Sequence, residues 1–196
     1  MTRTRIACAA ALTLALAPLG AGTASAARRA QGPPPPPKAT GGKKVTTIAQ
    51  GIPTPTQFAF GRGTVFVAGA GAEDGSAPGG VYTLKGGRAT RVKGSPRMVF
   101  GLAFSGGTLY ASSGPTIVAA SGWNGKTFTG GFKTIFTAPK GFTGFNGIAI
   151  RDGLIYAGVS MAEKGDSKKV DAPFAQSIVT LTTSGRDLTS YATGLR

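Results

Sequence analysis

The 196-residue chain contains few side chains of the kinds that perform nucleophilic or acid–base chemistry. It has no histidine at all, and its single cysteine is Cys8. These absences exclude from this chain a Ser-His-Asp triad, a Cys-His pair, a zinc site of histidine and cysteine ligands, and an imidazole general base. The chain has seven aspartates and glutamates, which could act as acids or bases, and 22 lysines and arginines.

Two glycine-rich or charged segments hold most of those carboxylates. Segment 69–80 contains Glu73 and Asp74 among five glycines, and segment 160–176 contains Glu163, Asp166 and Asp171. The Gly-Ala-Gly start of the first segment is similar to a dinucleotide-binding loop, but Asp74 stands where the third glycine should be and no helix is expected after it. The acidic spacing of the second does not fit a calcium-binding loop. Both patterns indicate solvated loops, and they predict neither a metal site nor a cofactor in this chain.

A hairpin pattern that occurs three times predicts the elements that position these loops. Segments 58–68, 102–112 and 148–158 each read as an apolar-small-apolar strand, a three-residue turn ending in glycine, and a second strand with an aromatic third residue. The three aromatic residues are spaced by 44 and 46 positions: Phe66, Tyr110 and Tyr156. A repeat of about 45 residues is the length of one β-propeller blade.

Two further strands are expected after each hairpin. The third strands lie at 81–84, 116–120 and 177–182, and the fourth at 89–93, 134–138 and 188–192. Four antiparallel strands per repeat predict an all-β fold of β-propeller blades, with three blades over about 56–93, 98–138 and 146–193. A sandwich or barrel would also have short strands, but it would not repeat its hairpin sequence. Glycine and proline together make up 45 of 196 residues, which fits a turn-rich β protein.

A lone outer strand is expected before the first blade, over 45–50. Its sequence, continued to residue 52, is similar to segment 190–195 at the end of the third blade. Propellers close with four to eight blades, and an open arc leaves apolar surfaces uncovered. We therefore expect a partial propeller over 45–196, half of a six-bladed ring, in a fragment of a longer protein. The alternative is that two chains complete the ring as a dimer.

The sequence FNGIAIRDGLIY at 145–156 resembles the six-bladed propellers of the glucose/sorbosone dehydrogenase group. It is also similar to the related gluconolactonase and NHL-repeat propellers. The sequence YATGLR at 191–196 resembles the segment that precedes an Asn-Pro or Gln-Pro dipeptide in the sugar dehydrogenases. The likeness covers roughly 45–196, and it implies the fold more strongly than the chemistry, because many propellers share this pattern.

The resemblance implies an incomplete catalytic site. In the quinone-dependent dehydrogenases a histidine acts as the base and directly precedes an Asn-Gly or Gly-Gly dipeptide. In this chain the matching dipeptide is Asn146-Gly147, and the residue before it is Phe145. The arginine that contacts the quinone matches Arg196, without the motif that follows it. In the lactonases Asn146 would match a metal ligand, but the equivalent Thr56 and Phe100 supply no further ligands, and a hard cation takes six or more oxygens. Asn146 also fits a left-handed turn residue.

A ligand surface is expected on the face that carries the long loops. Its candidate residues are Asn146, Phe145, Glu73, Asp74, Asp166 and Arg196, with the aromatic Phe142 beside them. Trp123 is expected near the opposite face, in packing rather than in ligand stacking.

The first 44 residues predict export. Residues 1–26 read as a secretory signal that ends in Ala-Ser-Ala, and 27–44 as a basic linker with five consecutive prolines. Cleavage would remove Cys8 and leave a secreted or cell-envelope protein with no transmembrane span. Arg28 and Arg29 leave an uncleaved anchor as the alternative.

The basic charge suggests partners outside the membrane. Residues 45–196 hold 15 basic and seven acidic residues, a net charge of +8. An anionic cell-surface polymer or another carbohydrate fits this charge, whereas scattered cations without an aromatic strip do not favour nucleic acid. We expect a secreted ligand-binding or interaction scaffold. The alternative is a sugar dehydrogenase-like or lactonase-like enzyme whose remaining site residues lie beyond Arg196. The isolated chain is expected to be marginally stable or to self-associate.

Overall fold

The computed structural model describes residues 40–142, 144–160 and 174–194. The chain divides into two units, Met1–Val45 and Thr46–Arg196. Of the first unit only 40–45 are described, as an exposed segment without a strand, so the predicted signal and most of the linker lie outside the described residues. The described part contains no helix, and hence no helix long and apolar enough to cross a membrane.

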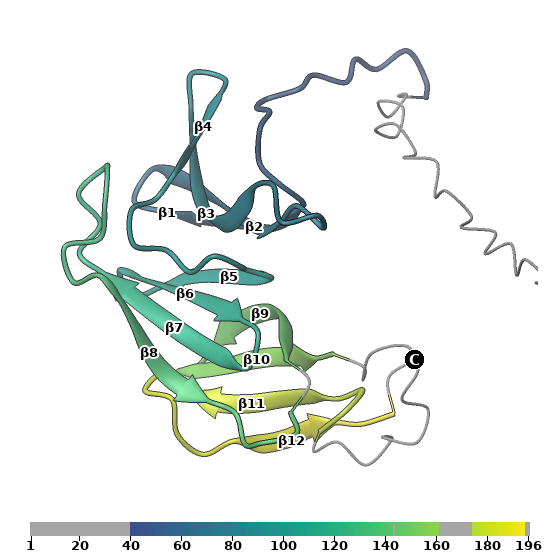
Figure 1. Cartoon of the computed structure of the whole chain (residues 1–196), viewed down its shortest axis with the longest axis vertical. Coiled ribbons are helices and arrows are strands. Elements are labelled where there is room, and N and C mark those ends of the chain that lie inside the picture. Colours follow the sequence, from purple (N-terminus) through teal and green to yellow (C-terminus); the bar gives the residue numbers. More distant parts are fainter. Residues whose placement is uncertain (1–39, 143, 161–173, 195–196) are drawn as a thin grey trace, which may run out of the picture. The chain divides into compact units, whose positions relative to one another are not determined.

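Twelve strands form three separate four-stranded antiparallel sheets, here called blades 1, 2 and 3 (Figure 1). Blade 1 contains β1 (Pro55–Gly61), β2 (Thr64–Gly71), β3 (Pro78–Lys85) and β4 (Arg88–Arg91). Blade 2 contains β5 (Gly101–Ser105), β6 (Thr108–Ser113), β7 (Thr116–Ser121) and β8 (Phe132–Thr137). Blade 3 contains β9 (Phe145–Arg151), β10 (Leu154–Val159), β11 (Ile178–Thr182) and β12 (Thr189–Ala192). The predicted all-β fold with four antiparallel strands per repeat is confirmed, and the sheets do not close into a ring.

The first hairpin of each blade turns on two residues, not the predicted three. Gly61 still pairs with Thr64, and the equivalent residues pair in the other two blades. The two turn residues in each case have positive φ: Arg62-Gly63, Gly106-Gly107 and Asp152-Gly153. Two consecutive left-handed residues characterise the type I′ turn, whose twist matches that of the strands beside it. Glycine at the second position therefore satisfies a backbone requirement in all three repeats.

An aromatic cluster packs blade 1 against blade 2. The ring of Phe66 stacks on Phe104 with centroids 5.8 Å apart and an interplanar angle of 7°. Trp123 meets the same ring edge-on at 5.0 Å, and its indole Nε1 donates a hydrogen bond to Thr64 Oγ1 at 3.0 Å. Trp123 therefore has a packing role between blades, with its polar nitrogen satisfied.

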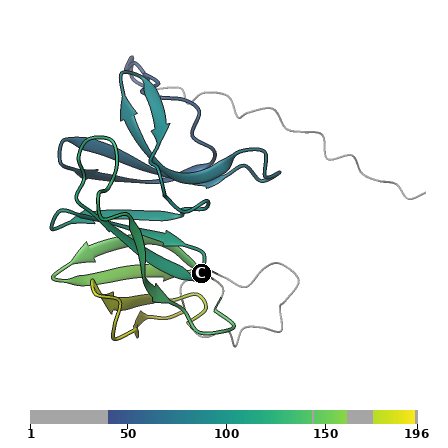
Figure 2. The same ribbon diagram turned by 60° about the vertical axis from the view of Figure 1, so that its left-hand side comes forward.

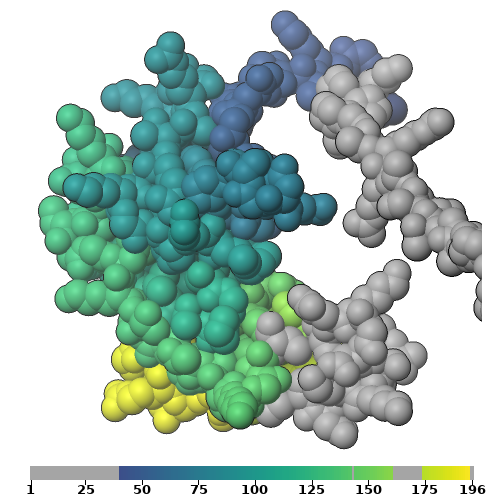
Figure 3. All heavy atoms as spheres, in the orientation of Figure 1, coloured from purple at the N-terminus to yellow at the C-terminus, as the bar shows by residue number. Residues whose placement is uncertain are grey.

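A second core lies between blade 2 and blade 3. Tyr110 and Ile117 of blade 2 pack with the fully buried Ile155 and Leu181 of blade 3. The 60° rotation of Figure 2 shows the three sheets stacked in chain order. The spheres of successive blades meet without a visible gap in Figure 3. Each blade thus buries its apolar face against the next blade.

The segment before β1 is not the expected outer strand. Over 46–52, only Gln50 pairs, as an isolated parallel bridge with Arg88 of β4. A strand requires a partner along its length, and this segment meets one residue of an edge strand instead.

Candidate functional site

The starts of the three first strands, β1, β5 and β9, lie at one end of the domain. Because each sheet is antiparallel, the turns after β2 and β6 and the end of β10 lie at this same end, which is on the right in Figure 1. We call it the loop end. It is the face on which the sequence predicts a ligand surface, and the polar side chains near it define the candidate site.

Gln57 of β1 joins the three first strands through its side-chain amide. Its Nε2 donates to the carbonyl oxygen of Ile148 on β9 at 2.8 Å, and its Oε1 accepts from the amide of the same residue at 3.2 Å. The same Oε1 accepts from the amide of Leu102 on β5 at 3.3 Å. One partly buried amide therefore satisfies backbone groups of two other blades.

Asn146 lies at the second position of β9 and is exposed. Its side-chain Oδ1 accepts a hydrogen bond from Ser160 Oγ at 2.9 Å, just after β10. Its backbone carbonyl accepts another from the hydroxyl of Ser112, which is fully buried on β6. Asn146 is therefore held from two sides while its side chain remains accessible to solvent.

A close backbone approach lies directly beside this residue. A Cβ atom on Gly101 would lie 2.6 Å from the carbonyl oxygen of Asn146 and 2.7 Å from the amide of Ile148. Only glycine lets β5 come this close to β9. This contact fixes where Asn146 stands relative to blade 2.

Phe145 is a core residue and is not exposed at the loop end. It is 1% exposed, and its ring centroid lies 4.6 Å from that of Phe142 and 6.0 Å from that of Phe136. Phe142 is partly buried against the same cluster. Of the predicted Phe145-Asn146 pair, the structure therefore places the asparagine at the surface and the phenylalanine in the core between blades 2 and 3.

Glu73 and Asp74 lie in the exposed turn between β2 and β3. Hydrogen bonds from the hydroxyl and the backbone amide of Ser76 lower the pKa of Asp74 below its ordinary value, and the amide donates to Oδ1 at 2.9 Å. Asp74 thus stabilises its own turn. Among the described residues, no hydrogen bond or ion pair joins this turn to Asn146.

The remaining predicted candidates, Asp166 and Arg196, lie outside the described residues. In the part of the chain that is described, no group of three or more His, Cys, Asp or Glu side chains could hold a metal ion. The polar groups around Asn146 are neutral amides and hydroxyls, from Gln57, Ser112 and Ser160, which donate and accept hydrogen bonds without gaining or losing protons near neutral pH.

Solved structures with this arrangement of strands exist. The PQQ-bound form of aldose sugar dehydrogenase from Streptomyces coelicolor is 24% identical to this chain, with a TM-score of 0.51 over 73% of this chain and 48% of that one. The three sheets are β-propeller blades. The chain matches less than half the length of that dehydrogenase, and at this identity the likeness shows the fold alone.

Two other solved structures match at lower TM-scores. The extracellular domain assigned to a one-component system of B. thetaiotaomicron has a TM-score of 0.44 and 9% identity, over 70% of this chain and 18% of that one. The computationally designed protein Ika4 has a TM-score of 0.36 and 12% identity, over 78% of this chain and 99% of that one. No protein-family model and no curated protein matches the sequence.

Three residues that shape the loop end are not among the predicted candidates: Gln57, Ser112 and Ser160. One signal in the sequence points to Gln57. In the aligned repeats it occupies the position that is glycine in the other two blades, Gly101 and Gly147. A long polar side chain where the repeat otherwise keeps glycine indicates a role specific to blade 1.

Proposed function

We propose that this protein is an exported β-propeller module that binds carbohydrate of the cell surface at its loop end. The observation that carries the proposal is the presentation of Asn146. Its side chain is exposed, while Ser160 and Ser112 hold its two oxygens. A polar group that is fixed before binding loses little conformational entropy when a ligand arrives. Amides and hydroxyls match the donors and acceptors of a sugar.

The charge of the domain supports a cell-surface partner. Residues 45–196 carry 15 basic against seven acidic residues, so an anionic polymer would be attracted over a long range. This attraction is weakened by salt, whereas hydrogen bonds to Asn146 are not. Salt dependence therefore separates the two contributions to affinity.

The test is a binding assay with purified chain and insoluble chitin, xylan or peptidoglycan at two salt concentrations. Asn146→Ala should weaken binding by tenfold or more at both concentrations. The matched control is Asn124→Ala, in the turn before Thr127 at the end of the domain opposite the loops. Equal affinity of Asn146→Ala and wild-type protein for every polymer would contradict the proposal.

The second candidate function is sugar oxidation, which the likeness to the PQQ-bound aldose sugar dehydrogenase favours. The position at which the resemblance places a base carries Phe145, whose ring is buried and accepts no proton. We therefore expect no dye reduction by this chain with added quinone and aldoses. Turnover in that assay would favour the enzyme over the binding module.

A further inference from the structure

Two sheet faces of the domain have no other sheet packed on them within the described residues. On blade 1 this face carries Phe58 and Phe60, which are 53% and 72% exposed. On blade 3 it carries Ala149, Tyr156 and Ile178, which line an open cavity of about 420 Å³. Exposed aromatic side chains gathered on a sheet face mark an interaction surface.

The positions exposed on blade 1 are buried in the other two blades. Phe58 corresponds in the repeat to Leu102 and Ile148, and these are 1% and 3% exposed against 53% for Phe58. Leu102 is covered by blade 1, and Ile148 by blade 2. The uncovered face of blade 1 is thus the same surface that each later blade buries against its predecessor.

The uncovered face of blade 3 is the other half of the same interface. Phe66, Tyr110 and Tyr156 occupy one repeat position. Phe66 stacks on Phe104 of the next blade, and Tyr110 packs in one cluster with Ile150 of the next. The residue of blade 1 that corresponds to Phe104 and Ile150 is Phe60. In both interfaces the aromatic residue of one blade packs on the residue at this second position in the next blade. The same pairing would place Tyr156 against the Phe60 of another copy of blade 1.

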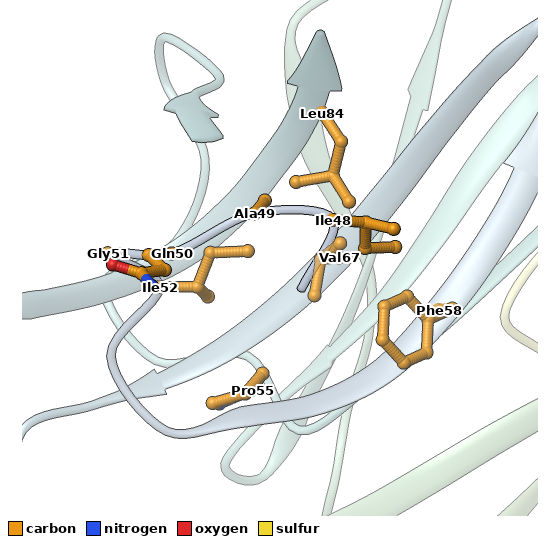
Figure 4. Close-up of a pocket in the computed structure, with 9 residues that line it drawn as sticks. All are labelled: Ile48, Ala49, Gln50, Gly51, Ile52, Pro55, Phe58, Val67 and Leu84. Carbon is orange, nitrogen blue, oxygen red and sulfur yellow. The ribbon is translucent and has the colours of Figure 1, made fainter. Parts of the chain in front are cut away.

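The segment before β1 covers the face of blade 1 only poorly. Figure 4 shows Ile48, Ile52 and Leu84 around a pocket of about 160 Å³ between this segment and the sheet. Ile48 is 66% exposed, and one bridge, Gln50 to Arg88, pairs the segment with the sheet. Protein interiors are normally packed without such space. The segment therefore leaves space between itself and the sheet, and it leaves Phe58 and Phe60 exposed.

We propose that blade 3 of one copy packs on blade 1 of a second copy, and that the reciprocal contact closes a two-fold ring. One chain carries both halves of the interface, so a second copy supplies the missing surface at both ends and the assembly closes. The match to 48% of the aldose sugar dehydrogenase chain supports three blades as about half of a ring. This assembly goes beyond the proposed ligand binding and does not depend on it.

The first test is the molar mass of the full chain, expressed with its own signal and recovered from the extracytoplasmic fraction. Light scattering at micromolar concentration should give twice the mass that mass spectrometry finds for the recovered chain. Phe60→Asp and Tyr156→Lys should each raise the dimer dissociation constant by 30-fold or more. Met98→Asp, which changes a residue 48% exposed between strands β4 and β5, should leave the dimer intact.

Mixing the two variants identifies which faces meet. In the mixed dimer, one interface joins the aspartate of Phe60→Asp to the lysine of Tyr156→Lys, and the other interface keeps the native Phe60 and Tyr156. The mixed dimer should therefore form at concentrations where neither variant dimerises alone. A single cooperative thermal transition in each variant would show that both variants fold. A monomer at all concentrations, no mixed dimer, or equal dissociation by Met98→Asp would overturn the proposal.

Discussion

Gln57 holds Ile148, 91 residues further along the chain, by two hydrogen bonds to its backbone. A third bond from the same side chain reaches Leu102 on the strand between them. We expect Gln57→Ala to lower the free energy of unfolding by about 1–3 kcal/mol, because three backbone groups lose their partner. Urea denaturation of the purified chain measures this change. Gln50→Ala, at an exposed residue, is the control, and an equal effect of both substitutions would contradict the role of Gln57.

Gly101→Ala tests the close approach of β5 to β9. The added Cβ would lie 2.6 Å from Asn146 O and 2.8 Å from Ser112 Oγ, so blades 2 and 3 must separate. We expect a loss of about 2 kcal/mol or more in calorimetry, within the range for overpacked sites. In Gly158→Ala the nearest atom, Asn146 Cβ, would be at an ordinary 3.8 Å, and that variant should be close to wild type. Similar melting temperatures for the two variants would refute the steric argument.

Phe145→Ala separates a core role from a ligand-face role. Since the ring is 1% exposed, its removal should cost about 3–5 kcal/mol, whereas Met98→Ala, at a residue 48% exposed, should cost much less. Thermal unfolding of both variants measures the difference. A small effect of Phe145→Ala on stability, combined with loss of polymer binding, would instead place this ring in the ligand site.

The repeat predicts the strands because the signals for each hairpin are local: alternating apolar residues and a turn glycine within eleven positions. It does not predict contacts between repeats. Gln57 has its partners 45 and 91 residues away, and no local pattern specifies such a distance. Phe145 stands among the predicted ligand-face candidates as an aromatic residue beside Asn146. In the structure Phe145 is buried and Asn146 is exposed, and the pairing of β9 with β10 is irregular between Ala157 and Val159, an irregularity that no local pattern predicts.

The segment 45–50 shows a further limit of the sequence. Its similarity to 190–195 predicts an outer strand, but similarity gives no information on which strand would pair with it. In the structure Gln50 alone forms a bridge, to Arg88. The predicted strand thus depends on a pairing partner that lies outside the segment's own sequence.

Asp74 should titrate below an ordinary aspartate. The Ser76 hydroxyl and amide stabilise its charged form, so the pKa is lowered in the folded protein. The stability that this contact contributes is present above the unfolded pKa of about 3.9 and is lost as the pH falls through the lower folded value. Carbon-detected NMR titration measures this pKa, and Ser76→Ala should raise it. An identical pKa in both proteins would rule out the Ser76 hydroxyl as a cause and leave the backbone amide of residue 76 as the stabilising donor.

The most direct test of the proposed binding module is hydrogen exchange of the full chain with and without a soluble oligosaccharide of the polymer it binds. We predict slower exchange at Asn146 and Gly147, and unchanged exchange in the turns at the opposite end, including 124–127. No protection at the loop end under saturating ligand, or protection confined to the opposite end, would contradict carbohydrate binding at Asn146.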